Sequence, residues 1–562
     1  MIDIQTQAEQ QLRNLLCSAV EKAKDNGELI QADIPEFVVE IPADSSNGDF
    51  ATNIAMIGAR AFKQAPKMIA QKIVDNIVLD DTYFDRCEIA GPGFINFFLN
   101  KTWFSEAIIA VLGEESHYGK TNFGLNKKVV VEFVSANPTG PMHIGNARGG
   151  AIGDCLSEIL SWAGYGTSRE FYVNDAGNQI EKFKKSLSIR YQQLFLGEQA
   201  VPLSEDCYQG ADIIQRAKDF ADIHKDKYMN VSEDERRQAL VEYALPLNIS
   251  GLKTDLLKYK IEYDKWFLES DLHKQGKLYE IVDMLKSRGY VYEDGGAVWF
   301  KATEFGGEKD DVLIRDNGIP TYFLADIAYH YNKLVDRGFD KAIDIWGADH
   351  HGHVARLKWA LEALGIDPKR LDIILMQMVR LVRDGETVKL SKRSGKSITL
   401  TSLLDEIPID AARFFFNMRE ANSHFDFDLD LAIEESSKNP VYYVQYAHAR
   451  ICQILKNLEE LGYKPSINSE YELLNTKEEI ELIKAIAKFP SEIIAAACSY
   501  NPSRITRFAL DIATLFHKFY TVCKVKGSED SLLNARLSLC CAVKITLKNA
   551  LTILNISAPE EM

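Results

Sequence analysis

The chain has 562 residues, of which 46% are hydrophobic and 26% are charged, and its formal net charge is −16. This length predicts several domains, and this composition excludes a largely disordered chain because enough apolar side chains are present to form large cores. The acidic balance excludes nonspecific nucleic-acid binding over the whole surface, since affinity for phosphate comes from clustered Lys and Arg. Residues 440–562 hold 14 basic and 13 acidic residues, so an anionic partner would meet the least repulsion there.

The start of the chain and its cysteines bear on location. MIDIQTQAEQQLRNLL carries acidic and amide residues where the apolar core of a secretory signal would stand, and no run of about 18 apolar residues follows it. The nine cysteines include no CxxC pair, which indicates neither a zinc knuckle nor a disulfide framework. We expect a cytoplasmic protein that does not enter a membrane.

The order of the patterns along the chain predicts a multidomain α/β protein. Residues 1–115 open with apolar positions at helical spacing and close with FINFFL, a run of strand length, so we expect a small α+β domain. VVVEFV at 129–134 predicts a parallel strand, and the turn-rich segment and helical pattern after it complete the opening of a nucleotide-binding unit.

The rest of the chain divides into a sheet domain and a helical domain. Residues 116–435 are predicted to form a Rossmann-like α/β domain, because strand patterns return at 342–348 and 372–382. An insertion is expected at about 185–260, where charges alternate along helical patterns. Residues 436–562 read almost entirely as helix, which predicts an all-α bundle.

Two segments carry the pattern of a phosphate site. Pro141, Met142, His143, Ile144, Gly145 and Asn146 stand between the predicted strand and helix, where free backbone N–H groups and the helix dipole favour a phosphate. VKLSKRSGKS, at 388–397, interleaves basic residues with Ser and Gly and could close on a triphosphate. The alternatives are a His143 that only caps a turn and a basic loop that is only solvated surface.

Together these segments resemble HIGH and KMSKS, the two signatures of class I aminoacyl-tRNA synthetases, in the same order and about 250 residues apart. EFVSANPTGPMHIGNARGGAIGD, at 132–154, is similar to the arginyl family's form, and further similar segments extend from GDFATNIA to YYVQYAHARI. This chain departs from the signatures at Asn146, Leu390 and Arg393. The resemblance implies a Rossmann-like class I catalytic domain, an N-terminal α+β appendage and a C-terminal all-α anticodon-binding bundle.

The resemblance also implies roles for individual residues. ATP would bind in the presence of Mg²⁺, which bridges phosphate oxygens. The implied ATP-binding residues are Pro141, His143, Gly145, Asn146, His350 and Lys392, and the implied catalytic residues are His143, Asn146, Lys389 and Lys392. The implied arginine-binding residues are Glu132, Asn137, Tyr322, Asp326 and His350.

The chemistry of arginine agrees with these residues, because a guanidinium offers five donors that suit carboxylate and carbonyl partners. Asp326 follows Tyr322 by four positions, so on a helix the two share a face. The alternatives are a Glu132 at a strand edge and a Tyr322 in the core. The DHHGH run at 349–353 suggests a metal on composition alone, but adjacent histidines point apart, and we expect no metal site there.

For the RNA, the resemblance implies contacts of Tyr443, Tyr446 and Met562 with the anticodon loop, and of Phe94 and Asn96 with the outer corner of the tRNA. Stacking of bases on aromatic rings is the usual mode for single-stranded RNA. The alternative for the tyrosines is a place in the bundle core.

The implied activity is that of an arginine–tRNA ligase, with L-arginine, ATP and tRNA(Arg) as partners and a monomeric chain. Another class I synthetase and a non-catalytic tRNA-binding paralogue are the alternatives. His143 and Lys392 are both present, whereas a paralogue would be expected to have lost them.

Overall fold

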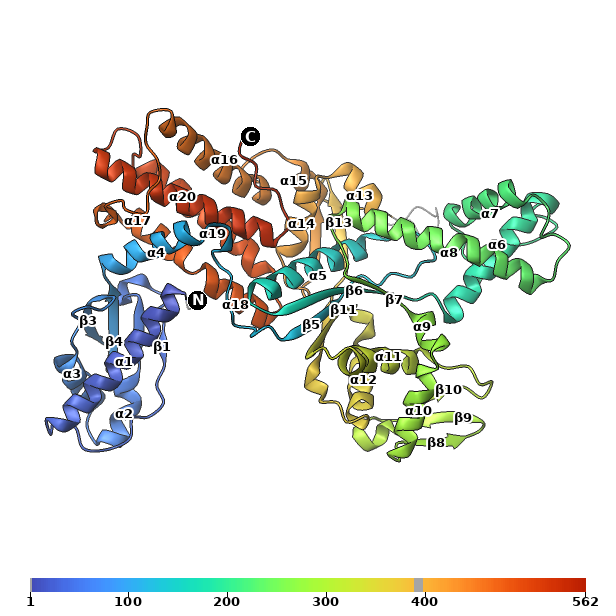
Figure 1. Cartoon of the computed structure of the whole chain (residues 1–562), viewed down its shortest axis with the longest axis horizontal. Helices are drawn as coiled ribbons and strands as arrows, with labels where there is room; N and C mark the ends of the chain where they lie inside the picture. The colour runs from blue at the N-terminus through green and yellow to red at the C-terminus, as the bar shows by residue number, and fades with distance from the viewer. Residues whose placement is uncertain (1–2, 389–397) are drawn as a thin grey trace.

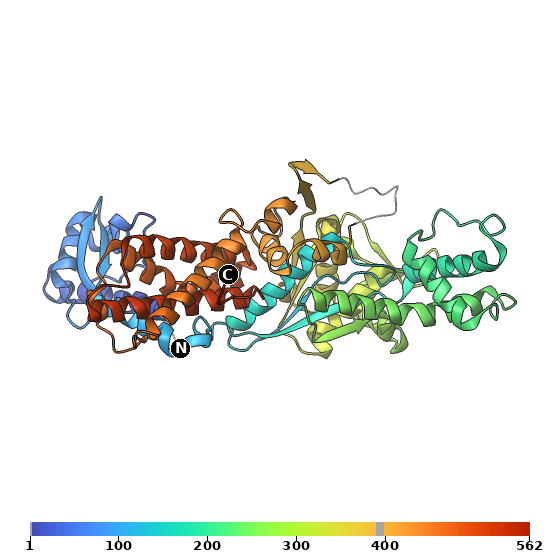
Figure 2. The ribbon, with the colours of Figure 1, turned by 90° about the horizontal axis from the view of Figure 1, so that it is seen from above.

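The computed structural model describes residues 3–388 and 398–562. Figures 1 and 2 show an elongated molecule. An N-terminal domain lies at one end, and a helical insertion lies at the other. A parallel sheet occupies the middle, and a helical bundle stands between the sheet and the N-terminal domain. None of the helices in these described ranges is long and apolar enough to cross a membrane.

The N-terminal domain is an antiparallel sheet of order β1-β2-β4-β3 covered by helices. The carboxylate of Asp3 accepts hydrogen bonds from the backbone N–H groups of Gln5 and Thr6, which starts the first helix. Its elements are α1 (Ile4–Asp25), β1 (Val39–Glu40), β2 (Phe50–Thr52), α2 (Ile54–Phe62), α3 (Pro66–Asn76), β3 (Phe84–Ala90) and β4 (Phe94–Leu99).

The central sheet has five parallel strands in the order β12-β11-β5-β6-β7. They are β5 (Lys128–Glu132), β6 (Gly166–Val173), β7 (Lys265–Leu268), β11 (Lys341–Gly347) and β12 (Leu371–Met376). From β5 the chain moves to β6 and β7 on one side and later returns to β11 and β12 on the other. In such sheets, ligands bind outside the carboxyl ends of the strands at the point where the order reverses, here between β5 and β11.

Two predicted strands have different limits in the structure. The strand expected at 129–134 ends at Glu132, because Val134 and Ser135 take positive φ angles of 69° and 40° and turn the chain. The strand expected at 372–382 is two strands, β12 and β13 (Val379–Arg383), which lie in different sheets. Gln377 breaks it, since its N–H donates to Ala421 and its carbonyl accepts from Arg148.

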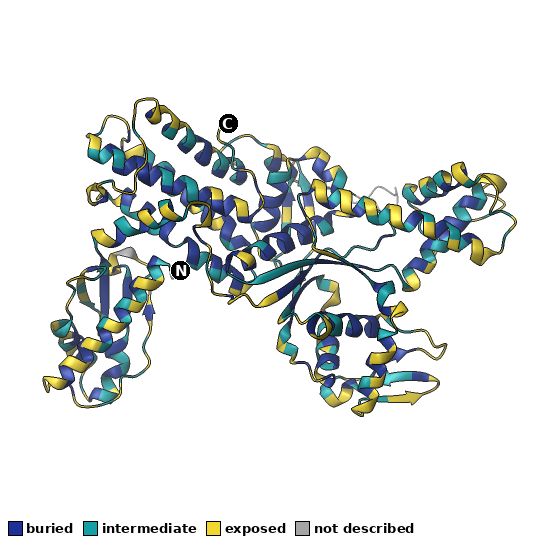
Figure 3. Ribbon diagram, in the orientation of Figure 1, coloured by how far each residue is buried: buried dark blue, intermediate teal, exposed yellow. Residues whose placement is uncertain are grey.

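Helix α5 (Ile144–Trp162) follows β5 and lies between the sheet and the bundle. Figure 3 shows it as one of the most buried helices. The insertion, α6 (Gly177–Leu196), α7 (Ala211–His224) and α8 (Glu233–Lys258), has a hydrophobic core of its own that includes Phe183, Leu187, Phe220 and Leu240. Its first helix begins at Gly177, about two helical turns before the predicted limit near residue 185.

A second subdomain, which the sequence patterns did not predict, lies between β7 and β11 and on the opposite side of the sheet from α5 (Figure 1). Its helices pack around a separate hydrophobic core. Its elements are α9 (Glu269–Lys274), α10 (Lys277–Ser287), β8 (Val291–Asp294), β9 (Ala297–Phe300), β10 (Asp311–Ile314) and α11 (Tyr322–Tyr331). Helix α12 (His351–Ala363), which follows β11 in the chain, packs on α11.

After the central five-stranded sheet, the chain forms a three-stranded sheet of order β14-β13-β15 and then the helical bundle. The connecting elements are β13, β14 (Glu386–Thr387), α13 (Leu400–Glu406), α14 (Ile409–Asn417), β15 (Phe425–Asp428) and α15 (Leu429–Ile433). The bundle comprises α16 (Pro440–Glu459), α17 (Lys477–Ala487), α18 (Phe489–Ser499), α19 (Ser503–Val522) and α20 (Asp530–Ile553). Helix α4 (Lys101–Glu114), which follows the N-terminal sheet, packs on α17 and α20 and so joins the first domain to the last.

One buried arginine ties the bundle to the sheet. The fully buried guanidinium of Arg413, on α14, pairs with Asp154 in the middle of α5. It also donates to the carbonyls of Leu554, at 3.0 Å, and Tyr259, at 3.1 Å. Asp154 in turn accepts from Arg169 on β6 at 3.0 Å. Segments from the sheet, the insertion and the end of the bundle therefore meet at this guanidinium.

We expect Arg413→Met to lower the free energy of unfolding by about 3–5 kcal/mol, because it leaves buried acceptors without their donor. Urea denaturation followed by circular dichroism measures the change. Arg419→Met, at an exposed position just after the same helix, is the matched control and should change stability by less than about 0.5 kcal/mol. Equal losses in the two variants would contradict the role of Arg413.

Candidate active site

A cleft lies outside the carboxyl ends of β5, β6 and β11, at the reversal point of the sheet. It consists of three adjoining hollows of about 820, 230 and 650 Å³. Ser135, on the turn after β5, lines all three, so they are compartments of one cleft. We call them the first, second and third hollows, in that order.

The first hollow holds the loop that precedes α5. Pro141, His143 and Asn146 line it together with Asn137. His143 is the N-cap residue of α5, and its backbone N–H donates to the Asn146 side-chain oxygen at 3.0 Å. Asn146 therefore caps the helix with its oxygen and retains its amide N–H₂ group as a donor. In the first helical turn the N–H groups of Ile144 and Asn146 donate to the carbonyls of Ile398 and His143. Among the described residues this leaves the Gly145 N–H and the positive end of the helix dipole to attract an anion.

Gly145 lies in that first turn with no atom within 4 Å of the position that a Cβ would take. The surrounding protein therefore does not require glycine there. A ligand that closely approaches the helix N-terminus would require it, since a Cβ would stand in the way.

The segment that follows the second signature is fixed to the first. Leu400 donates its backbone N–H to the carbonyl of Met142 at 2.9 Å, and Ile144 donates to the carbonyl of Ile398 at 3.3 Å. Thr399 forms a β-bridge with His143 and also lines the first hollow. Lys389 and Lys392 lie outside the described residues. The segment from Ile398 to Leu400 thus lies beside the first hollow.

The second hollow is backed by a buried ionic cluster. Lys333, on a π-helical turn (Asn332–Asp336) after α11, is fully buried. Its ammonium lies 2.5 Å from Glu132 Oε2 and 2.9 Å from Asp344 Oδ1. The other oxygen of Glu132 accepts from Ser135 at 2.8 Å. Glu132 is therefore a buried, paired carboxylate that lines the hollow, and the edge-strand alternative does not apply.

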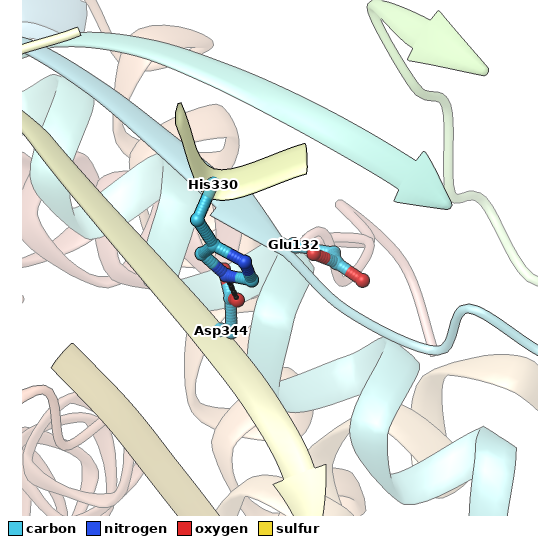
Figure 4. A group of neighbouring side chains, drawn as sticks. All are labelled: Glu132, His330 and Asp344. Carbon is cyan, nitrogen blue, oxygen red and sulfur yellow. Dashed lines mark hydrogen bonds and ion pairs between the residues drawn. The ribbon is translucent and has the colours of Figure 1, made fainter. Parts of the chain in front are cut away.

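Figure 4 shows Glu132, His330 and Asp344 as neighbouring side chains. Their possible ligand atoms lie within 4.8 Å of one another. A metal would need a lone pair on the imidazole, but one ring nitrogen faces the Asp326 carbonyl at 2.7 Å and the other faces Asp344 at 2.6 Å. The Lys333 ammonium already supplies the positive charge. The cluster therefore fits an internal ion pair and not a metal site.

The cluster sets the charges of its two carboxylates. Burial opposes the charged form of Asp344, but Lys333 and His330 overcome it and lower its pKa from 3.8 to about 2. Since the folded-state pKa is lowered, the stability that Asp344 contributes is complete above about pH 4 and is lost as the pH falls toward 2. Burial raises the pKa of Glu132, and Lys333 opposes that rise.

The third hollow contains the predicted Tyr322 and Asp326, with Asn137 and His350. Tyr322 is 40% exposed at the start of α11, so it is not a core residue. Asp326 and His350 also line the second hollow. The structure thus gathers the five predicted arginine-binding residues around two adjoining hollows.

Sequence reasoning missed several residues of this cleft. The spacing that linked Tyr322 to Asp326 extends by four more positions to His330, and this signal could have found it. Lys333 and Asp344 gave no signal, because their pairing depends on a strand and a π-turn that only the fold brings together. His353, from the run at 349–353, donates to Asp326 at 2.7 Å instead of facing its neighbouring histidines.

The predicted anticodon residues lie on the bundle. The rings of Tyr443 and Tyr446, on α16, lie 4.9 and 6.1 Å from the His517 ring on α19. Tyr446 is 41% exposed, so it is not a core residue. Tyr443 is partly buried against the bundle core, so a place in the core describes part of its ring. Met562 is 52% exposed. Its neighbour Glu561 pairs with Lys456, which lies ten residues after Tyr446 on α16, or roughly 15 Å along the helix.

The two residues predicted for the tRNA corner differ in exposure. Phe94 is half-buried at the start of β4, whereas Asn96 is only 6% exposed. Asn96 stands between β2 and β3, opposite Ala51 and Glu88. Phe94 therefore offers an RNA more of its surface than Asn96 does, and both contacts stay predictions.

We expect Lys333→Met to lower the free energy of unfolding by about 3–5 kcal/mol, because it leaves two buried carboxylates without a cation. Adding Asp344→Asn should recover part of the loss, since it removes one of the two charges. Urea denaturation at pH 7 compares the wild type, the single variant and the double variant. A double variant no more stable than Lys333→Met would mean that the charges are not the cause.

Comparisons with known proteins cover the whole chain. The family model for the catalytic domain of class I (R) tRNA synthetases matches residues 107–453. The model for the arginyl-tRNA synthetase N-terminal domain matches 10–99, and that for the DALR anticodon-binding domain matches 444–562. Arginine–tRNA ligases of Caldanaerobacter subterraneus and Ruminiclostridium cellulolyticum are 53% and 51% identical, over 100% of both chains in each comparison.

Solved structures agree in fold. A putative arginyl-tRNA synthetase of Campylobacter jejuni is 34% identical, with a TM-score of 0.74, and the match covers 83% of this chain and 100% of that one. The arginyl-tRNA synthetase of Thermus thermophilus, at 20% identity, shares the fold with a TM-score of 0.74 over 98% of this chain and 100% of its own. With matches to a family model in each of its three parts and with relatives more than 50% identical over their full length, the chain belongs to the arginyl-tRNA synthetase family of class I.

Proposed function

We propose that the cleft joins L-arginine to ATP, giving arginyl-adenylate and pyrophosphate, and then passes arginine to the 3′-terminal ribose of tRNA(Arg). As a member of its family, the chain is an arginine–tRNA ligase of the class I type, with ATP as a substrate. The proposal concerns the residues that carry the two steps. Neither another class I specificity nor a non-catalytic paralogue is favoured.

The observation that carries the proposal is the attachment of Thr399 and Leu400 to Met142 and His143. It joins the chain after the basic segment to the helix N-terminus that faces the first hollow. Cationic side chains close to that N-terminus would stabilise the charge that develops on the departing pyrophosphate. We assign this role to His143, Lys389 and Lys392, and we assign Asn146 to a phosphate or ribose oxygen through its amide N–H₂.

The first hollow suits ATP that carries its own Mg²⁺. Asp212 is the one carboxylate among the described residues that line it, and burial raises its pKa. Mg²⁺ prefers several oxygen ligands and retains water, so here the phosphates would supply most of its ligands. Pro141 and Gly145 then shape the approach of the phosphates. His350 lines the second and third hollows, and we assign it to the contact between the nucleotide and the amino acid.

The second and third hollows suit arginine. Asp326 offers a carboxylate at the junction of the two, and Tyr322 and Asn137 add polar groups at the rim of the third. The charge of Glu132 is largely offset by Lys333, so we assign Asp326 as the principal partner of the guanidinium. Glu132 closes the inner end of the second hollow.

The chain's own residues act by position. The carboxylate of arginine attacks the α-phosphorus of ATP and pyrophosphate leaves, so no side-chain nucleophile is needed. In the second step the ribose hydroxyl of the tRNA attacks the arginyl carbonyl and AMP leaves. We further infer that Tyr443, Tyr446 and Met562 meet the anticodon loop, that Phe94 meets the tRNA corner, and that one chain forms the complete cleft as a monomer.

The test of the proposal is ATP–pyrophosphate exchange with each amino acid, in the presence of tRNA. We expect arginine to support exchange at least about 10⁴-fold better than lysine, because lysine would leave buried acceptors unpaired. Asp326→Ala should reduce the use of arginine sharply and leave the KM for ATP nearly unchanged. Equal activation of lysine or glutamate by the wild type would overturn the proposed site.

For the RNA, we expect Tyr446→Ala and Tyr443→Ala each to weaken binding of tRNA by about 1–3 kcal/mol if each ring carries a base. Tyr279→Ala, which removes a similarly exposed tyrosine from α10, away from the bundle, is the matched control. Filter binding measures the affinity, and exchange of arginine at saturating tRNA checks that the cleft is intact. Unchanged binding in both variants would leave the tyrosines as parts of the bundle alone.

A further inference from the structure

A chain of polar side chains begins at Asp326 and runs beside the third hollow, which His353 and Arg356 also line. Neither of these two residues has a role in the reaction described above. Asp326, on α11, accepts from His353 Nε2 on α12 at 2.7 Å. His353 Nδ1 lies 2.6 Å from Arg356 Nη2, and Arg356 Nη1 donates to Asp311 Oδ1 on β10 at 2.7 Å. Three hydrogen bonds thus connect the carboxylate of Asp326, on a helix, to the buried carboxylate of Asp311, on strand β10.

The partners decide which nitrogen of His353 carries the hydrogen. A guanidinium only donates, so Nδ1 of His353 must accept from Arg356. The hydrogen then lies on Nε2, which donates to the carboxylate of Asp326. In this arrangement the imidazole is neutral, and the positive charge of Arg356 is paired with Asp311.

Aromatic rings hold the two linking side chains in place. The Arg356 guanidinium lies 5.1 Å from the centre of the Phe323 ring. The His353 ring lies 5.7 Å from Phe323 and 5.6 Å from Trp346. Because each partner is packed, the imidazole cannot swing away from Asp326 without losing both its hydrogen bonds and its ring contacts.

The neutral imidazole has an electrostatic consequence. An arginine paired directly with Asp326 would cancel its charge and compete with the substrate's guanidinium. An imidazole in its neutral form orients the carboxylate and leaves its negative charge for a cation. A carboxylate has about four acceptor positions, so one bond from His353 leaves room for a guanidinium.

We propose that His353, oriented by Arg356 and Asp311, is a positioning residue that fixes Asp326 for the guanidinium of arginine without neutralising it. This inference rests on the role proposed above for Asp326. It makes His353 and Arg356 determinants of affinity for arginine, although neither needs to touch it.

The experiment measures the KM for arginine and the KM for ATP by exchange with the full chain and tRNA. We expect His353→Ala to raise the KM for arginine by about 10- to 100-fold, the range for loss of a hydrogen bond to a charged group. The KM for ATP should change by less than about threefold. His353→Gln should recover most of the loss, because its amide N–H₂ can replace the Nε2 donor.

Arg356→Lys should give an intermediate KM for arginine, since one ammonium cannot span both His353 and Asp311 as the planar fork does. Glu362→Ala, at an exposed position near the end of α12, is the control and should change neither constant. Thermal melting identifies variants that fail to fold. If His353→Ala does not fold, the KM for arginine and the KM for ATP of Arg356→Lys and His353→Gln test the proposal instead.

A KM for arginine within about twofold of the wild type in His353→Ala would overturn the proposal, and so would equal increases in both constants. If His353→Gln is as poor as His353→Ala, an N–H donor at this position does not support binding of arginine, and the proposal is also wrong. If the proposed function itself is wrong, the result is different: the wild-type protein does not catalyse ATP–pyrophosphate exchange when arginine is added.

Discussion

Asp154 lies in the middle of the helix that starts at the first hollow, and its carboxylate binds a guanidinium that no water reaches. Arg413 cannot be held there by Asp154 alone, because a buried cation needs several acceptors, and the carbonyls of Tyr259 and Leu554 complete its shell. These carbonyls follow the insertion and the last bundle helix. The position of α5, and with it the helix N-terminus in the cleft, therefore depends on segments from the whole chain.

The same logic governs the charges of the cleft. Glu132, Asp344 and Asp326 would repel one another if all three were charged and unpaired. Lys333 is fully buried between the first two and offsets them, while Asp326 is held by a neutral imidazole. One carboxylate thus keeps its charge for the substrate, and the others stabilise the floor of the second hollow. Mutation of the internal cation and mutation of the free carboxylate should have different effects, the first on stability and the second on recognition.

The anticodon side is built differently. Tyr446 stands on the surface, but its neighbour His517 loses exposure in the bundle, and burial and Arg450 lower the pKa of its imidazole. The imidazole and the two tyrosine rings form an aromatic surface, in which the Tyr446 ring is inclined by 25° and the Tyr443 ring by 49° to the His517 ring. Such a surface suits stacked bases, whose affinity depends on ring contact more than on the charge attraction that the acidic chain lacks.

The sequence by itself determined the fold class, the family and a set of polar residues of the cleft, because these depend on local patterns and on the resemblance that they carry. The predicted strand at 129–134, the turn-rich loop and the helix after it are encoded within about 35 residues. The two signatures are each ambiguous alone and are recognisable together from their order and spacing. The five arginine-binding candidates came from the resemblance, and they line adjoining hollows. The second subdomain gave no such local pattern, and its short strands and helices were missed.

The tertiary structure alone decided how the charges are paired. Lys333 meets Glu132 across 201 positions, and Arg413 meets Asp154 across 259, so no spacing in the sequence could reveal either pair. It also ended the first strand at Glu132, through two residues with positive φ, and divided the predicted strand at 372–382 where Gln377 pairs with other segments. Long-range electrostatic partners depend on which elements the fold packs together, and this is the physical reason that they escape a sequence reading.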